Sequence, residues 1–200
     1  MSEDIGALDT FPKLLMHHAR VRGSRPAIRE KDLGIWQTWT WHEFAEETRA
    51  LASALAAMGF KRGDHFALVG DNRPRLYAAM AAVQCLGGIP VPLYQDAVAA
   101  EMVFPIQAAG VAFVFAEDQE QVDKLLEILP QCPTITRIIY DDPRGLRHYR
   151  QPQLLAYDKV IEEGRQSYRC DPSFIETEIA KGTGSDTAAM FFTSGTTAAP

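Results

Sequence analysis

A run of hydroxyl side chains near the end of the chain contains the residues best suited to chemistry. The segment that follows the apolar stretch 188–192 consists of Thr193, Ser194, Gly195, Thr196 and Thr197. Hydroxyl groups and successive backbone N–H groups can bind an anion, and glycine lets the backbone come close to it. Ligands of open α/β sheets bind where the strands end. The segment therefore predicts a phosphate-binding loop, although an ordinary Ser/Thr-rich turn would have the same composition.

No other motif predicts a catalytic centre as clearly. The sequence contains no GxxxxGK[ST] phosphate loop, and the glycine pair in the stretch 182–184 lacks the third glycine of a dinucleotide-binding motif. Ser194 lacks the preceding glycine of the GxSxG pattern found around hydrolase nucleophiles. Cys85, Cys132 and Cys170 are widely spaced, which excludes a CxxC zinc site and indicates reduced thiols rather than a disulfide framework.

Two clusters near the N-terminus favour solvated surface over a binding site. His17 and His18 are adjacent, so on a helix they lie about 100° apart and are poor joint metal ligands. A basic cluster follows, and its members are Arg20, Arg22, Arg25, Arg29 and Lys31. These side chains could contact a phosphate group or an anionic membrane, but a solvated face is the favoured interpretation.

Composition places the chain among ordinary globular proteins. Its 200 residues are 46% hydrophobic and 23% charged, which excludes disorder and collagen-like or coiled-coil structure for the whole chain. The net charge of −6 comes from residues 101–200, where 15 acidic residues face 9 basic ones, and this argues against a nucleic-acid partner. The acidic N-terminus and the interrupted apolar stretches predict neither a secretion signal nor a spanning helix. We expect a cytoplasmic protein whose membrane contact, if any, is peripheral.

Alternating helical and strand patterns begin near residue 40. Thr40 and Glu43 form a capping-box pattern, which predicts a helix that ends at Gly59. The apolar run 65–69 predicts a buried strand, and Pro74 is a start signal for a second helix. The next strand, 89–93, contains two prolines that cannot donate hydrogen bonds, so we expect it at a sheet edge or where the sheet is interrupted.

The second half of the chain continues this alternation. The pattern predicts helices over 98–109 and 117–129, and strands over 111–115 and 135–140. A polar loop over 141–153, a helix from Leu154 to about Glu163 and a final strand over 188–192 complete the prediction. Strands and helices that alternate about every twenty residues indicate βαβ units. The predicted fold class is therefore α/β, with a mostly parallel sheet flanked by helices.

Three blocks of sequence resemble one known family. The end of the chain, FTSGTTAAP over 192–200, resembles the phosphate-loop signature YTSGTTGxPKG of the AMP-forming adenylating enzymes. The block 39–44 (WTWHEF) and the block 70–93, from GDNRP to GGIPVPL, are similar to the two upstream blocks of that family. Within the family, the stretches 92–94 (PLY) and 155–165 are most similar to long-chain fatty acyl-CoA synthetases.

The resemblance carries an expected domain organisation and two departures. It implies an N-terminal tail over 1–10 and an incomplete AMP-binding large domain over 11–200, cut within its phosphate loop. Ala198 stands where the family has glycine, and the chain stops at Pro200, before the lysine of the family motif. The acyl pocket, the nucleoside contacts and the catalytic lysine of the family lie downstream of this point. The resemblance therefore implies that the 200 residues alone are inactive and contain no catalytic residue.

The resemblance also implies a reaction and its ligands. A carboxylic acid and MgATP would form an acyl-adenylate and diphosphate, and coenzyme A would then displace AMP. The ATP phosphates would be held by Ser194, Gly195, Thr196, Thr197 and Ala198, together with Thr193, which would also approach Mg²⁺. Partners would be a fatty acid, ATP and coenzyme A, with no nucleic acid, and the protein would be cytoplasmic or peripheral at the inner face of the membrane.

Two other functions stay open at this point. One is an adenylating enzyme that activates aryl or amino acids, because the pocket-lining residues that would distinguish the acids are absent from the chain. The other is a non-catalytic α/β module that binds a nucleotide, which the departure at Ala198 would suit. The sequence contains nothing that sets the length of an acyl chain or the oligomeric state.

Overall fold

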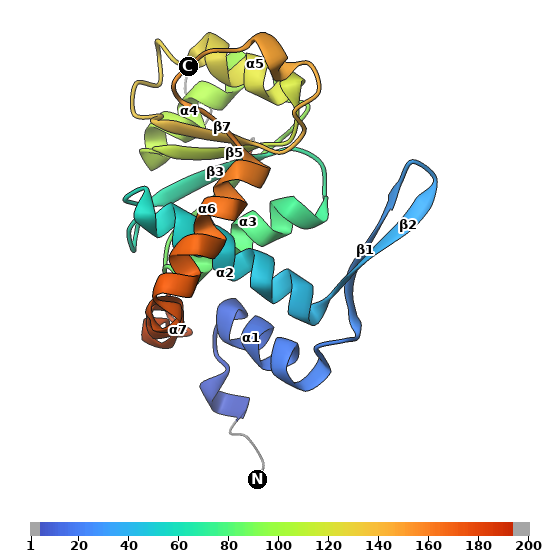
Figure 1. The fold of residues 1–200 in the computed structure, drawn as a ribbon. Helices are drawn as coiled ribbons and strands as arrows, with labels where there is room; N and C mark the ends of the chain where they lie inside the picture. The colour runs from blue at the N-terminus through green and yellow to red at the C-terminus, as the bar shows by residue number, and fades with distance from the viewer. Residues whose placement is uncertain (1–4, 194–200) are drawn as a thin grey trace.

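The computed structural model describes residues 5–193 and confirms the α/β class (Figure 1). The first elements are α1 (Phe11–Arg22), β1 (Pro26–Asp32), β2 (Ile35–Thr40), α2 (Trp41–Ala57), β3 (His65–Val69), α3 (Pro74–Cys85) and β4 (Ile89–Leu93). They are followed by α4 (Ala99–Ala109), β5 (Phe113–Ala116), α5 (Gln119–Ile128), β6 (Arg137–Tyr140), β7 (Leu154–Ala156), α6 (Tyr157–Cys170) and α7 (Pro172–Lys181). Short 3-10 helices occupy Ile5–Ala7 and Leu146–His148.

A five-stranded parallel sheet forms the centre of the fold, in the order β4-β3-β5-β6-β7. Helices cover both faces of this sheet, as expected when parallel strands are joined by helical crossovers (Figure 1). One face packs Phe66, Leu68 and Phe115 against α2, α3 and α6, and the other packs Val69 and Val114 against α4 and α5. The strands are therefore apolar on both faces, which explains their continuous rather than alternating hydrophobic pattern.

Local signals in the sequence locate several of these elements correctly. The Thr40 hydroxyl accepts a hydrogen bond from the Glu43 backbone N–H, and the Glu43 carboxylate accepts one from the Thr40 N–H, so the predicted capping box starts α2. Gly59 has a φ of 93° where the chain leaves α2. Strand β4 lies at the edge of the sheet, as its prolines predicted.

One predicted helix begins at the wrong residue, and one predicted strand is absent from the described residues. The helix expected from Leu154 is α6, which begins at Tyr157. The residues Leu154–Ala156 form β7 rather than the first turn of a helix, because they pair in register with residues 138–140 of β6. The stretch 188–192 is not a strand, although the Met190 N–H donates to the Pro90 carbonyl oxygen at 2.9 Å. The groups of β4 that face this stretch belong to Pro90 and Pro92, which have no N–H. A strand over 188–192 paired with β4 would therefore lack half of the hydrogen bonds between the two segments.

The sequence also left two N-terminal elements unplaced. Strands β1 and β2 form an antiparallel hairpin whose base rests on α2, through Ile28 and Trp39 packed near Phe44. Helix α1 packs on α2 and α3, with Leu15 buried. Asp9, in the predicted tail 1–10, accepts a hydrogen bond from the Gly184 N–H. The division into a tail and a domain over 11–200 stays a prediction.

A close approach of α6 to α2 depends on a glycine. Gly164 of α6 lies against the backbone of α2, where an added Cβ would overlap the Ala50 carbonyl oxygen. We expect Gly164→Ala to push the helices apart and lower the free energy of unfolding by about 2 kcal/mol, despite the better helix propensity of alanine. Urea unfolding measures this change.

The matched control is the neighbouring exposed residue of the same helix. Glu163→Ala removes only a surface ion pair with Lys159 at 3.8 Å, so its effect should stay within about 0.5 kcal/mol. Equal unfolding free energies for Gly164→Ala and the parent chain would contradict the close packing of α2 on α6.

Candidate functional site

The carboxyl edge of the parallel sheet is where a ligand is expected in this architecture. The first strand of this sheet in chain order is β3. The next strand, β4, pairs on one side of β3, and β5 pairs on the other side. The loops after β3 and β5 therefore run to opposite faces of the sheet, and they leave a crevice between them. The residues that border this crevice are Gly70, Asp71, Arg73 and Glu117.

Glu117 fills this crevice with a carboxylate. One of its oxygens accepts a hydrogen bond from the Asp71 backbone N–H, and the other accepts one from Nε of Arg73, both at 2.5 Å. Gly70 is needed beside it, because its φ of 151° and the lack of a Cβ allow the Glu117 side chain to lie against its backbone. The crevice is thus occupied by an internal ion pair, which uses the Asp71 N–H and the Arg73 guanidinium.

A second polar cluster lies next to it and joins four elements. Arg75 of α3 donates to Asp141 after β6 at 2.7 Å and to Asp158 of α6 at 2.8 Å. Its guanidinium carbon lies 4.7 Å from the centre of the buried Tyr157 ring. Glu47 of α2 lies 3.9 Å from Arg75. Arg75 therefore holds α2, α3, β6 and α6 together through charge.

Burial controls the protonation of this cluster. It raises the pKa of Glu47 above the ordinary value, and this effect exceeds the opposing one of Arg75 and Arg165. Burial and the Glu47 carboxylate also raise the pKa of Tyr157 well above its usual range. For Arg75, burial opposes the charge, but the hydrogen bond to Asp141 and the charges of Asp141 and Asp158 together outweigh burial, so the pKa of the guanidinium is raised. Burial also raises the pKa of Asp141, against the opposing effect of Arg75. Arg75 thus stays charged, while burial favours the protonated form of both carboxyl groups.

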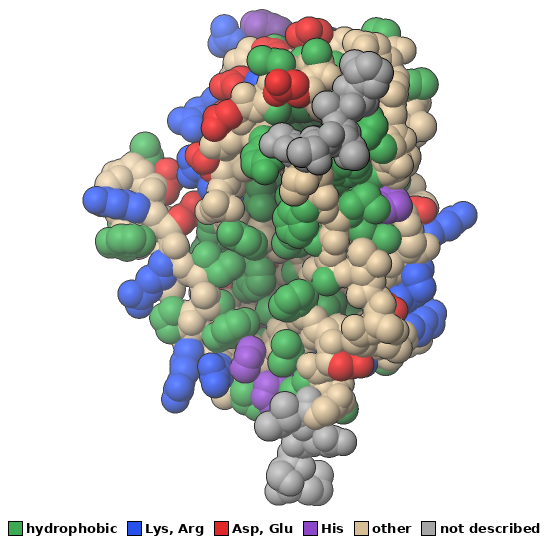
Figure 2. Space-filling model, turned by 180° about the vertical axis from the view of Figure 1, so that it is seen from behind, with side chains coloured by type: hydrophobic (Ala, Val, Ile, Leu, Met, Phe, Trp, Pro, Cys, Tyr) green, Lys and Arg blue, Asp and Glu red, His purple; other side chains and the backbone are tan. Residues whose placement is uncertain are grey.

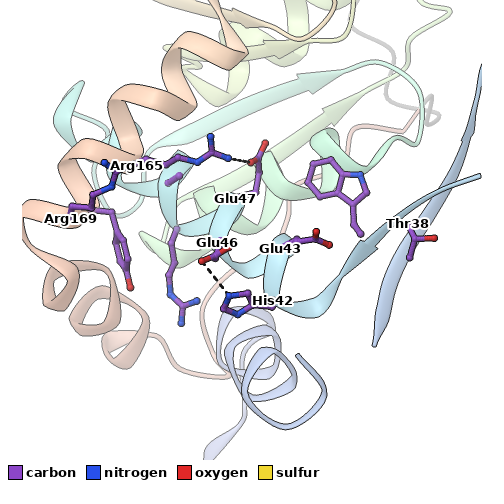
Figure 3. Close-up of a pocket in the computed structure, with 11 residues that line it drawn as sticks. Thr38, His42, Glu43, Glu46, Glu47, Arg165 and Arg169 are labelled. Atoms are coloured by element: carbon purple, nitrogen blue, oxygen red, sulfur yellow. Dashed lines mark hydrogen bonds and ion pairs between the residues drawn. The ribbon is translucent and has the colours of Figure 1, made fainter. Parts of the chain in front are cut away.

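A hollow of about 750 Å³ lies between α2 and α6 (Figure 3). Arg165 reaches across it from α6 to Glu47 at 3.3 Å, and His42 and Glu46 pair along α2 at 3.3 Å. The carboxylate of Glu43 is used by the helix cap. Because its acidic groups already have partners, this hollow contains no free carboxylate among the described residues for general acid–base catalysis, and we interpret it as a charge-paired groove between helices.

The structure describes only the first residue of the predicted phosphate loop. The chain passes Gln84, which donates to the Ala188 carbonyl oxygen at 2.7 Å, and then Pro90, which accepts from Met190. It therefore runs parallel to β4, and Phe192 packs on Phe104 of α4 with 5.9 Å between ring centres.

Thr193 is exposed and follows Met190 by three residues, or about 10 Å of extended chain. This places it near the carboxyl end of β4, the edge of the sheet where the sequence predicted the loop. Ser194, Gly195, Thr196, Thr197 and Ala198 lie outside the described residues. Their role in phosphate binding stays a prediction.

The described residues do not by themselves provide a metal centre. Within residues 5–193, no three His, Cys, Asp or Glu side chains are placed to hold one ion. Thr193 supplies a hydroxyl, which suits Mg²⁺ only as one ligand among several oxygens. Its role as a magnesium ligand stays a prediction, and the other ligands would have to come from outside these residues.

The sheet order and the helices on both faces define a doubly wound α/β protein. Residues 15–200 match the family of AMP-binding enzymes. The chain therefore belongs to the AMP-binding enzyme family, which confirms the resemblance found in the sequence.

Individual relatives are similar over nearly all of this chain. The long-chain-fatty-acid–CoA ligase FadD15 of Mycobacterium bovis is 23% identical over 196 residues, which cover 98% of this chain and 31% of the relative. The long-chain-fatty-acid–CoA ligase ACSBG2 of Homo sapiens is 24% identical over 196 residues, which cover 96% of this chain and 28% of the relative. The chain thus spans about a third of the length of the curated relatives it matches.

A solved structure shares the fold. The anthranilate CoA ligase AuaEII, in complex with anthranoyl-AMP, superimposes with a TM-score of 0.65 over 76% of this chain and 26% of that chain. At 16% identity, this likeness supports the adenylate-forming fold and nothing about the acid that is used.

Sequence reasoning missed the ion pairs at the carboxyl edge. The Arg73–Glu117 and Arg75–Asp141 pairs join residues 44 and 66 positions apart. A local pattern cannot indicate such a pair. The available signal was that acidic residues come within two positions of the ends of two predicted strands, at Glu117 and Asp141, where parallel strands end at one edge.

The raised pKa of Glu47 gives a pH dependence of defined sign. The folded chain holds the Glu47 proton more tightly than the unfolded chain does, so this group favours folding below its ordinary pKa of 4.5, and its contribution falls as the pH rises. Glu47→Gln stays neutral at every pH. We expect unfolding free energies, measured in urea from pH 4 to 7, to shift in favour of Glu47→Gln relative to the parent chain as the pH rises.

The neighbouring Glu46, whose side chain is exposed, supplies the control. Glu46→Gln should show a much smaller change with pH, because water solvates that carboxylate in both states. If instead the unfolding free energy of Glu47→Gln falls relative to that of the parent chain as the pH rises, the ion pairs with Arg75 and Arg165 outweigh burial. The expected sign of the pH dependence would then be wrong.

Proposed function

We propose that this chain is the N-terminal part of a long-chain fatty acid–CoA ligase. The observation that carries the proposal is the family match over residues 15–200, together with the alignment to FadD15, which covers 98% of the chain at 23% identity. The reaction would join a fatty acid and ATP into an acyl-adenylate and diphosphate, and coenzyme A would then release AMP. An acyl substrate is favoured over an aryl acid because the fatty acid ligases align along the whole chain, whereas AuaEII supports the fold alone.

The role of this chain in that reaction would be to hold the ATP phosphates. Backbone N–H groups from Gly195 to Ala198 and the hydroxyls of Ser194, Thr196 and Thr197 would stabilise the negative charge that develops on the departing diphosphate. Mg²⁺ would neutralise part of the same charge, with Thr193 near it. The position of Thr193 at the carboxyl end of β4 supports this arrangement.

Further polypeptide would be needed for activity. A hollow of about 560 Å³ beside the stretch 188–192 is lined mainly by apolar groups, among them Phe11, Tyr77 and Phe191, which are 64%, 40% and 67% exposed. Figure 2 shows apolar side chains gathered over the middle of the face behind Figure 1. An uncovered apolar surface of this kind supports a proposal that residues 1–200 alone are inactive and that more of the fold covers this face in the whole protein.

The place of action would be the cytoplasm, with contact to the inner face of the membrane. Within the described part of the chain, no helix is both long enough and apolar enough to cross a bilayer. Long-chain fatty acids dissolve in membranes, so a peripheral position would give the enzyme access to its substrate.

The products of the reaction test this function. With a fatty acid, ATP and coenzyme A, the whole protein should release AMP and diphosphate in proportion to acyl-CoA. Chromatography of the nucleotides distinguishes AMP from ADP. Release of ADP, or activity only with an amino acid or an aryl acid, would show that the proposed reaction is wrong.

The hydroxyl loop has its own test in the whole protein. Thr196→Ala removes a hydrogen bond to a charged phosphate, worth about 1.5 to 3 kcal/mol, so kcat/KM for ATP should fall about tenfold or more. The control is Thr187→Ala. Thr187 is an exposed threonine just before the stretch 188–192, which runs beside β4. An unchanged rate for Thr196→Ala would show that the segment is an ordinary turn.

A further inference from the structure

The hairpin of β1 and β2 projects from the body of the molecule (Figure 1). Its tip carries apolar side chains. Leu33, Ile35 and Trp36 at its tip are 88%, 65% and 66% exposed. A two-stranded sheet gains stability from its base packed on α2, so these tip side chains contribute little to folding. Exposed apolar groups on a projecting element are typical of a surface that meets an apolar partner.

The backbone at the tip does not favour the leucine that occupies it. Leu33 has a φ of 47° and Gly34 a φ of 82°, so both central residues of the turn are in the left-handed region. Turns of this kind favour Asn-Gly, because asparagine tolerates positive φ better than leucine does. Leucine is therefore strained at this position and also exposed. The local structure offers no reason for it, which points to a role in binding.

Basic side chains surround this apolar tip on its outer side. Residues 20–32 contain five basic and two acidic residues. Lys31 lies directly across from Trp36 in the hairpin, and Arg29 across from Thr38, on the more exposed face. Within residues 5–193, neither Arg29 nor Lys31 forms an ion pair, whereas Glu30 on the other face lies 3.7 Å from Arg73. Figure 2 shows blue side chains along the hairpin and down the same edge of the molecule.

We propose that the β1–β2 hairpin inserts its tip into the surface of an anionic lipid bilayer. Tryptophan prefers the interface between headgroups and acyl chains, and Leu33 and Ile35 would enter the apolar layer beside it. Lys31 lies two residues from Leu33, or about 7 Å along the strand, which matches the depth of about 5 to 10 Å for interfacial segments. Lys31 and Arg29 would then lie among the anionic headgroups.

The arrangement of charge favours a bilayer over a protein partner. The apolar groups lie at the end of the hairpin, with Lys31 and Arg29 behind them on the exposed face. The acidic side chains Glu30 and Asp32, with Leu33, border a hollow of about 480 Å³ between the hairpin and the body of the molecule. A bilayer has the complementary order, with an anionic surface above an apolar layer. The inference rests on the proposed function only for the purpose of lipid binding, which would be to bring the protein to a fatty acid dissolved in the membrane. Binding to lipid can be measured without any reaction.

The test is sedimentation of the full-length protein with vesicles, in the absence of ATP, coenzyme A and fatty acid. We expect binding to phosphatidylcholine vesicles that contain about one third phosphatidylglycerol, weaker binding to pure phosphatidylcholine, and a decrease with added salt. Trp36→Ser and Leu33→Asn should each weaken binding about tenfold. Leu33→Asn also gives the turn its preferred Asn-Gly sequence, so it should not lower the free energy of unfolding.

The charged residues and two control positions complete the set. The double variant Arg29→Gln with Lys31→Gln should lose the preference for anionic vesicles but keep weak binding. Tyr94→Ser removes a 72% exposed aromatic ring outside the hairpin, and Lys61→Gln removes an exposed cation there. Both controls should bind vesicles as the parent protein does.

Three results would overturn the proposal. These are absence of binding to anionic vesicles, unchanged binding by Leu33→Asn and Trp36→Ser, and an equal loss of binding in the two control variants. A protein that binds vesicles through the hairpin but makes no acyl-CoA would refute the proposed function and leave this inference intact. A protein that makes acyl-CoA but binds no vesicles would do the reverse.

Discussion

The hydrogen bonds on both sides of β3 are the interaction on which the rest of the structure depends. This strand pairs in parallel with β4 on one side and with β5 on the other, so it joins the two directions in which the sheet grows. Phe66 and Leu68 point to one face of the sheet, while Ala67 and Val69 point to the other. The helices α2, α3, α4, α5 and α6 then cover the two faces. A change in β3 register would therefore exchange the side chains of both cores at once.

The outer edge of β4 sets the position of the segment that leads to the predicted phosphate loop. Pro90 and Pro92 present carbonyl oxygens to this segment but no N–H groups, so it is held by few backbone hydrogen bonds. The ring of Phe192 against Phe104 and the amide of Gln84 supply additional contacts. The segment is thus guided along the sheet to its carboxyl edge by side chains as much as by the sheet itself.

The carboxyl edge of the sheet is divided between two tasks. Between β3 and β5 the crevice is filled by Glu117 and Arg73, and Arg75 links the neighbouring helices to Asp141 and Asp158. These charges join the sheet to the helices around it. The phosphate chemistry proposed for this family member would take place on the far side of β4, near Thr193. The ligand would therefore bind beside the usual crevice of such sheets rather than within it.

The sequence by itself determined the elements whose signals are local. The capping box at Thr40, the glycine at residue 59 and the paired prolines of β4 each act through neighbouring residues, so the start of α2, its end and the edge position of β4 could be predicted. The family also followed from the sequence, because its motif lies in one continuous stretch. The phosphate loop itself stays a prediction, since only Thr193 of it is among the described residues.

Tertiary structure decided the rest. Leu154–Ala156 became a strand because β6 offered it a partner, and the stretch 188–192 did not become one because β4 could not donate to it. The Arg75 cluster and the contact of Gly164 with α2 join residues that are far apart in the chain. Propensity and periodicity act over a few neighbouring residues, whereas strand pairing, helix contact and burial of charge depend on which segments the fold brings together.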